Sequence, residues 1–126
     1  MGHQAREVHD WTDHVWTEVW IDDLGRWVHM DSCENSFDQP LLYEDGWGKK
    51  LTYCISVSNI EVVDVTKRYV IDPYYNKIRR TLVNEEWLDG HLKTKREQLW
   101  EMSGQSLQML KDRHSKEMEQ ICDRHD

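Results

Sequence analysis

Cysteine is scarce in this chain, and the few cysteines are not arranged in pairs. The 126 residues include only Cys33, Cys54 and Cys122, and no two of them form a C-x-x-C motif. An odd number of isolated cysteines argues against a disulfide framework and is typical of reduced intracellular thiols. Three such cysteines cannot supply a structural zinc site by themselves. We therefore expect free thiols and no cysteine-only metal site.

Long apolar runs and clustered basic residues are also missing. No segment is apolar enough over sufficient length to cross a bilayer, and residues 1–15 are too polar for a secretory signal. Acidic residues outnumber basic ones by 24 to 16, which gives a formal net charge of -8. A surface of this kind does not favour contacts to phosphate groups. The composition predicts a cytosolic chain that binds neither nucleic acid nor membrane.

What the chain does contain is tryptophan, at seven residues against one phenylalanine. Its length allows one small unit with a modest core. Periodicity divides it into a strand-rich segment to about residue 66, a mixed connector to residue 83 and a helical region over residues 84–126. We therefore predict an α+β fold in which an antiparallel sheet is followed by a helical C-terminal tail.

The clearest local prediction is a β-hairpin formed by residues 14–20 and 26–31. Gly25 ends the turn between them and can adopt the positive φ that such a turn requires. The register pairs Ile21 with Arg26, Val19 with Val28 and Thr17 with Met30 on one face, and Trp20 with Trp27, Glu18 with His29 and Trp16 with Asp31 on the other. The first face is largely apolar, so we expect it to be buried. The second brings His14 diagonally close to Asp31.

Later segments predict further strands and a capped helix. Residues 40–44 predict a loop or helical turn that ends at two nearby glycines. In residues 51–58, apolar and small polar side chains alternate, as in a half-buried strand, and residues 61–66 are expected to be its shorter partner. Asn84 is suited to cap the helix that follows. Its later part carries an apolar stripe made of Leu107, Leu110, His114, Met118 and Ile121.

Four stretches carry more specific motifs. They are DHVWTEVW at residues 13–20, RWVHMDSCENSFDQPLLYEDGWGKK at 26–50, LTYCISVS at 51–58 and VVDVTKRY at 62–69. In this order they resemble cytosolic peptide:N-glycanase, a family with a transglutaminase-like fold related to papain-like thiol hydrolases. The resemblance implies that residues 1–83 are the C-terminal part of that core, a half domain, and that residues 84–126 are its helical tail.

The resemblance also implies a chemistry for the histidine and aspartate. The family removes N-linked glycans from misfolded N-glycosylated proteins in ER-associated degradation, by hydrolysing the amide bond between asparagine and glycan. A cysteine thiolate attacks the side-chain carbonyl, a glycosylamine leaves, and hydrolysis of the thioester converts asparagine to aspartate. By motif position, His14 is the general base and acid of a Cys-His-Asp triad and Asp31 orients it.

The family's nucleophilic cysteine and its two zinc-binding C-x-x-C pairs lie upstream of the histidine, whereas residues 1–13 contain no cysteine. We therefore expect a fragment of a glycanase, from a truncated gene model or a partial copy, that is inactive alone and holds no cofactor. The alternative is a non-catalytic transglutaminase-like module that binds glycoprotein or a degradation partner. The resemblance implies a cytoplasmic location, with the nucleus as a second compartment.

Several side chains have two interpretations. Trp16, Trp20 and Trp27 either contact substrate or pack in the core. Cys33 is expected to be a buried structural thiol, although with His29 and Asp31 it also forms an H-x-D-x-C pattern that could bind a metal. The apolar stripe of the tail either packs on the sheet or docks a partner, such as the proteasome shuttle factors that the family uses.

Overall fold

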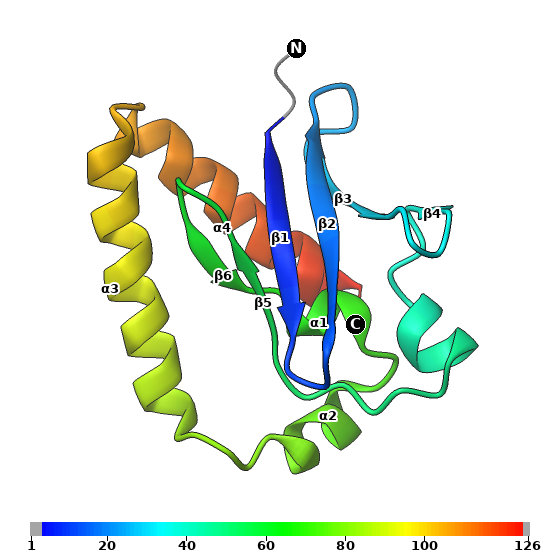
Figure 1. Ribbon diagram of the computed structural model, residues 1–126. Coiled ribbons are helices and arrows are strands. Elements are labelled where there is room, and N and C mark those ends of the chain that lie inside the picture. The colour runs from blue at the N-terminus through cyan, green and yellow to red at the C-terminus, as the bar shows by residue number, and fades with distance from the viewer. Residues whose placement is uncertain (1–3, 125–126) are drawn as a thin grey trace.

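The computed structural model describes residues 4–124, which form one antiparallel sheet with helices around it (Figure 1). The strands are β1 (Ala5–Asp10), β2 (His14–Ile21), β3 (Arg26–Asp31), β4 (Ser36–Phe37), β5 (Cys54–Val57) and β6 (Val62–Asp64). The helical elements are η1 (Leu42–Gly46), α1 (Thr66–Tyr69), α2 (Pro73–Arg79), α3 (Glu85–Ser103) and α4 (Leu107–Asp123). The strand order is β4-β3-β2-β1-β5-β6. The predicted α+β class is confirmed.

The predicted hairpin is formed by β2 and β3, in the predicted register. Ile21 pairs with Arg26, Trp20 with Trp27, Val19 with Val28, Glu18 with His29 and Thr17 with Met30. Gly25 has a φ of 63° and donates its N–H to the carbonyl of Ile21 at 2.9 Å. This left-handed turn residue fixes the register, and the register decides which side chains share a face.

The prediction that the apolar face of the hairpin is buried holds only in part, since both faces contribute buried side chains. Val19 and Val28 on the apolar face are 9% and 0% exposed, as expected. Met30, on the face expected to be covered, is 36% exposed, whereas Glu18, His29 and Asp31 on the other face are each at most 2% exposed. Helix α4 lies across that second face of the sheet (Figure 1). Charged side chains can be buried there because each one meets a charged or hydrogen-bonding partner, which offsets the cost of removing it from water.

Strand β1 was not predicted, because its sequence AREVHD looks like a solvated tail. Arg6 is nevertheless buried, because it meets partners from distant parts of the chain. Arg6 is hydrogen-bonded to Glu18, Glu61 and Glu117, and Arg68 is bonded to two of the same carboxylates. We call these five residues the charge cluster. It joins β1 and β2 to α4 and to the segments on either side of β6.

The second strand pair is present but shorter than predicted. Strand β5 pairs with β6, and within β5 the buried side chains are the small ones, since Cys54 and Ser56 are fully buried while Val57 is 39% exposed. The Cys54 side chain belongs to the core cluster, and the Ser56 hydroxyl donates to the carbonyl of Val63. Small side chains are favoured at these positions because they face the packed interior.

Two longer helices end the described chain. The side chain of Asn84 caps α3 as predicted, accepting from the N–H of Trp87, and α3 runs beside the edge strand β6 (Figure 1). Helix α4 packs its stripe on the sheet, with Leu110 fully buried and Ile121 6% exposed. The packing interpretation is confirmed for these two residues, whereas Leu107 at the start of the stripe is 42% exposed. Within residues 4–124, no helix has the length and apolarity needed to cross a membrane.

Candidate functional site

The two residues singled out as a catalytic pair are in direct contact. His14 begins β2 and Asp31 ends β3, and antiparallel pairing brings these two positions to the same end of the hairpin. His14 Nε2 lies 2.9 Å from Asp31 Oδ2. The imidazole keeps 21% of its side-chain surface exposed, whereas the carboxylate keeps 2%. A buried carboxylate thus holds a histidine that can still be reached from outside.

The Asp31 carboxylate is held from several sides. The hydroxyl of Tyr43 donates to Oδ2 at 2.7 Å, and the backbone N–H of Cys33 donates to Oδ1 at 3.1 Å. Burial alone raises the pKa of this carboxyl, but the hydrogen bonds from Tyr43 and His14 outweigh it and lower the pKa below its ordinary value of 3.8. Asp31 is therefore ionised at neutral pH, as a partner of an imidazolium must be.

This arrangement assigns the tautomer of His14. A carboxylate only accepts hydrogen bonds, so the His14 nitrogen that faces Asp31 must carry a proton. In the neutral ring the proton therefore sits on Nε2, and Nδ1 carries the free lone pair. Among the described residues, the structure records no hydrogen bond to Nδ1. An orienting carboxylate on one nitrogen and an available lone pair on the other is the arrangement of a general base.

Aromatic rings surround His14. The ring of Trp47 meets it edge-on with a centroid separation of 5.2 Å, Tyr43 lies at 5.6 Å and Trp16 at 5.8 Å. Trp47 is 39% exposed, whereas Tyr43 and Trp16 are buried. These rings shield the His14–Asp31 hydrogen bond from water, which strengthens it.

The expectation that Trp16 and Trp27 contact substrate needs correcting, because both are core side chains. Trp16 is 2% exposed and stacks on Tyr43 with a centroid separation of 3.9 Å. Trp27 is 4% exposed, and the guanidinium of Arg6 lies 3.9 Å from its ring centroid. Neither has a ring face open to a sugar. Trp20 is partly exposed, so its contact with substrate stays a prediction.

The cysteines are free, and Cys33 is not where it was expected. The prediction of a buried thiol at Cys33 was wrong, because the residue follows β3 in an exposed turn. The buried thiol is Cys54, and burial raises its pKa, so it is a poor nucleophile. Within residues 4–124 there is no group of three or more side chains placed to bind a metal ion. His29 is buried and engaged elsewhere, so the H-x-D-x-C pattern does not converge.

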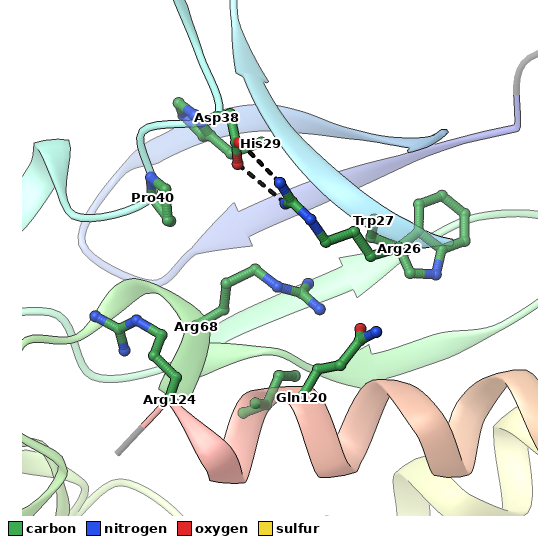
Figure 2. Close-up of a pocket in the computed structure, with 9 residues that line it drawn as sticks. Arg26, Trp27, His29, Asp38, Pro40, Arg68, Gln120 and Arg124 are labelled. Atoms are coloured by element: carbon green, nitrogen blue, oxygen red, sulfur yellow. Dashed lines mark hydrogen bonds and ion pairs between the residues drawn. The ribbon is translucent and has the colours of Figure 1, made fainter. Parts of the chain in front are cut away.

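A cavity of about 160 Å³ lies between β3 and the C-terminal end of α4 (Figure 2). Its wall includes His29 and three arginines, Arg26, Arg68 and Arg124. Arg26 forms two hydrogen bonds with Asp38, drawn as dashed lines in Figure 2, and Arg68 belongs to the charge cluster. The cavity does not include His14, so the reactive edge of the histidine lies outside it.

Sequence reasoning missed two residues of this site, Tyr43 and His29. Tyr43 lies on η1, which follows the hairpin and folds back over it, and its ring is completely buried against Trp16. No spacing rule relates a tyrosine in a helical turn to an aspartate 12 positions earlier. His29 lay on the correct face in the register, but nothing in the pattern showed that it would contact Tyr43 rather than Asp31.

Comparison with known proteins gives one family and a consistent set of relatives. Residues 4–124 match the family model described as the Rad4 transglutaminase-like domain. Three relatives share the name peptide-N(4)-(N-acetyl-beta-glucosaminyl)asparagine amidase. The one from Arabidopsis thaliana is 44% identical over 121 residues, covering 95% of this chain and 17% of the relative. The one from Gallus gallus is 56% identical over 85 residues, which is 68% of this chain and 13% of the relative. The human one is 54% identical over 88 residues, which is 70% of this chain and 14% of the relative. The chain thus spans less than a fifth of the length of these relatives.

Proposed function

Because the chain belongs to the Rad4 transglutaminase-like domain family, we propose that His14 and Asp31 are the base and the orienting carboxylate of a thiol amidase. The observation that carries this proposal is the 2.9 Å contact between His14 Nε2 and a buried Asp31 oxygen, which leaves His14 Nδ1 for a thiol. The reaction we propose is that of the amidases to which the chain is similar, hydrolysis of the amide that links a glycan to asparagine.

The proposed chemistry needs a thiol that this pair can activate. His14 Nδ1 takes the proton of a cysteine supplied by a segment outside this chain, and the thiolate attacks the asparagine side-chain carbonyl. The imidazolium, stabilised by Asp31, then returns the proton to the departing glycosylamine. Water, deprotonated by the same histidine, hydrolyses the thioester and leaves aspartate. None of the chain's own cysteines is bonded to His14, so we propose that the chain alone is inactive.

The proposed substrates are misfolded N-glycosylated proteins, and the proposed setting is ER-associated degradation in the cytoplasm, with the nucleus as a second compartment. The similarity to the named amidases supports the substrate class. A proteasome shuttle factor is a proposed partner. Leu110 and Ile121 of the apolar stripe are buried, so this part of α4 is not open to such a partner in the structure.

A complementation assay tests the function. The purified chain is incubated with a denatured N-glycoprotein, alone and with the upstream part of the Arabidopsis thaliana relative that contains that family's cysteine. We expect deglycosylation only in the mixture. It should fall by at least about 10³-fold when the chain carries His14→Ala or Asp31→Asn. His9→Ala is the matched control, because His9 is an exposed histidine of the neighbouring strand, paired with Glu7 and outside the site.

Two outcomes would overturn the proposal. Activity of the chain alone would show that a cysteine outside our scheme is the nucleophile. If the chain with His14→Ala is folded and the mixture still deglycosylates the substrate at the same rate, His14 is not the base. The alternative of a glycoprotein-binding module with a tryptophan face is weakened, because two of the three tryptophans that suggested it are buried.

A further inference from the structure

A chain of hydrogen bonds extends from the candidate pair into the interior. The backbone N–H of Gln39 donates to His29 Nδ1 at 3.2 Å, and His29 Nε2 lies 2.7 Å from the Tyr43 hydroxyl. That hydroxyl lies 2.7 Å from Asp31 Oδ2, the same oxygen that contacts His14. We call this series, from Gln39 through His29 and Tyr43 to Asp31, the relay.

The direction of every bond in the relay follows from its first member. A backbone N–H can only donate, so His29 Nδ1 must accept and the proton of the neutral ring must be on Nε2. Nε2 therefore donates to the Tyr43 oxygen. This leaves the Tyr43 proton to be donated to Asp31, which as a carboxylate can only accept. The opposite polarity would put two acceptors or two donors face to face at one of the links.

Burial makes this polarity costly to change. Tyr43 is completely buried and His29 is 1% exposed, so water does not provide alternative partners. Burial also lowers the pKa of His29 below its ordinary value, which keeps the ring neutral despite the nearby carboxylates. The charged and titratable groups that face the relay are Asp31, His14, Glu18, Glu34, Asp38 and Cys54.

We propose that His29 and Tyr43 are positioning residues that fix Asp31, and through it the Nε2-protonated tautomer of His14. Asp31 Oδ2 receives one proton from Tyr43 and one from His14, so the tyrosine sets where the carboxylate stands when it meets the histidine. The catalytic meaning of the relay rests on the proposed function. Its geometry can be tested without any reaction.

The test is nitrogen-15 NMR of the histidine rings in the full chain. At neutral pH we expect the rings of both His14 and His29 to be Nε2-protonated when neutral, with the lone pair on Nδ1. In Tyr43→Phe, His29 Nε2 loses its acceptor and Asp31 loses a donor. We then expect the single tautomer of His14 to be lost and replaced by a mixture.

Tyr69→Phe is the matched control. Tyr69 is also completely buried, belongs to the same core and donates its hydroxyl proton to a buried carboxylate, Glu18, but it lies outside the relay. If Tyr43 has only a structural role, Tyr43→Phe and Tyr69→Phe should change the histidine tautomers to the same extent. The relay predicts that Tyr69→Phe leaves the tautomers of His14 and His29 unchanged.

Two results would overturn the relay. An Nδ1-protonated His29 in the unsubstituted chain would contradict its polarity, and this measurement requires no variant to fold. A folded Tyr43→Phe variant with an unchanged His14 tautomer would contradict the positioning role. If the tautomers are as expected but the complementation assay shows no deglycosylation, the proposed function is wrong while the relay stands. Failure of the relay and failure of the proposed function can therefore be distinguished.

Discussion

The charge cluster predicts an unusually large loss of stability when Arg6 is replaced by methionine. Arg6 is completely buried and makes five hydrogen bonds, shared among Glu18, Glu61 and Glu117. With Arg68, two arginines face three glutamates, so the intact cluster already carries one net negative charge. Removing Arg6 leaves three buried carboxylates with a single cation.

Breaking a buried ion pair by removing one partner costs about 3–5 kcal/mol, because it leaves a buried charge without compensation. If the urea m-value is about 2 kcal/mol/M, a loss of about 4 kcal/mol lowers the unfolding midpoint by about 2 M. Equilibrium urea unfolding followed by tryptophan fluorescence measures this shift directly. The matched control is Arg26→Met, which breaks a half-exposed pair with Asp38 and should cost no more than about 1 kcal/mol.

A double-mutant cycle separates charge from packing. Glu117→Gln removes one carboxylate from the cluster, so in the Arg6→Met background it should relieve the repulsion among the remaining carboxylates. The loss of unfolding free energy caused by Glu117→Gln should therefore be smaller there than in the unsubstituted chain, by about 0.5–3 kcal/mol. If Arg6→Met shifts the midpoint no more than Arg26→Met does, the cluster does not hold α4 on the sheet. If the two cluster substitutions are additive, their effects come from packing alone.

Three further predictions follow from the site and the core. Burial raises the pKa of Glu18 and of Glu117, but their arginines outweigh it and lower both below the ordinary 4.5. The stability that these two carboxylates contribute is therefore present above pH 4.5 and is lost as the pH falls below it. Urea unfolding midpoints should stay level from pH 7 to about pH 4.5 and decrease between there and pH 3. Asp31→Asn should reduce complemented deglycosylation by about 10⁴-fold, with little change in the circular dichroism of the chain. Trp16→Ala should cost about 3–5 kcal/mol in urea unfolding and Trp20→Ala clearly less, and equal costs would contradict the burial difference between them.

The parts of the fold that were predictable depend on local signals. The Gly25 turn fixed the hairpin register, and with it the approach of His14 to Asp31. Asn84 gave the start of α3, and the spacing of the apolar stripe gave the docked face of α4. Each of these follows from backbone geometry or periodicity within about twenty residues.

What could not be predicted depends on partners far apart in the sequence. Arg6 meets Glu117 across 111 positions, so a charged segment that looked solvated became β1, one of the two central strands of the sheet. The polar hairpin face was buried for the same reason. Tyr43 reaches Asp31 only because η1 folds over β3, and a hydrophobicity pattern contains no information about that contact.

The central claim is that His14 can activate a cysteine supplied by another segment. Its most direct test is the pH dependence of alkylation of that cysteine in the complemented mixture, with the chain unsubstituted or carrying His14→Ala. We expect the unsubstituted chain to make the thiol reactive at pH values well below its ordinary pKa of about 8.5, and His14→Ala to abolish this shift. The same alkylation profile with both chains would contradict the claim.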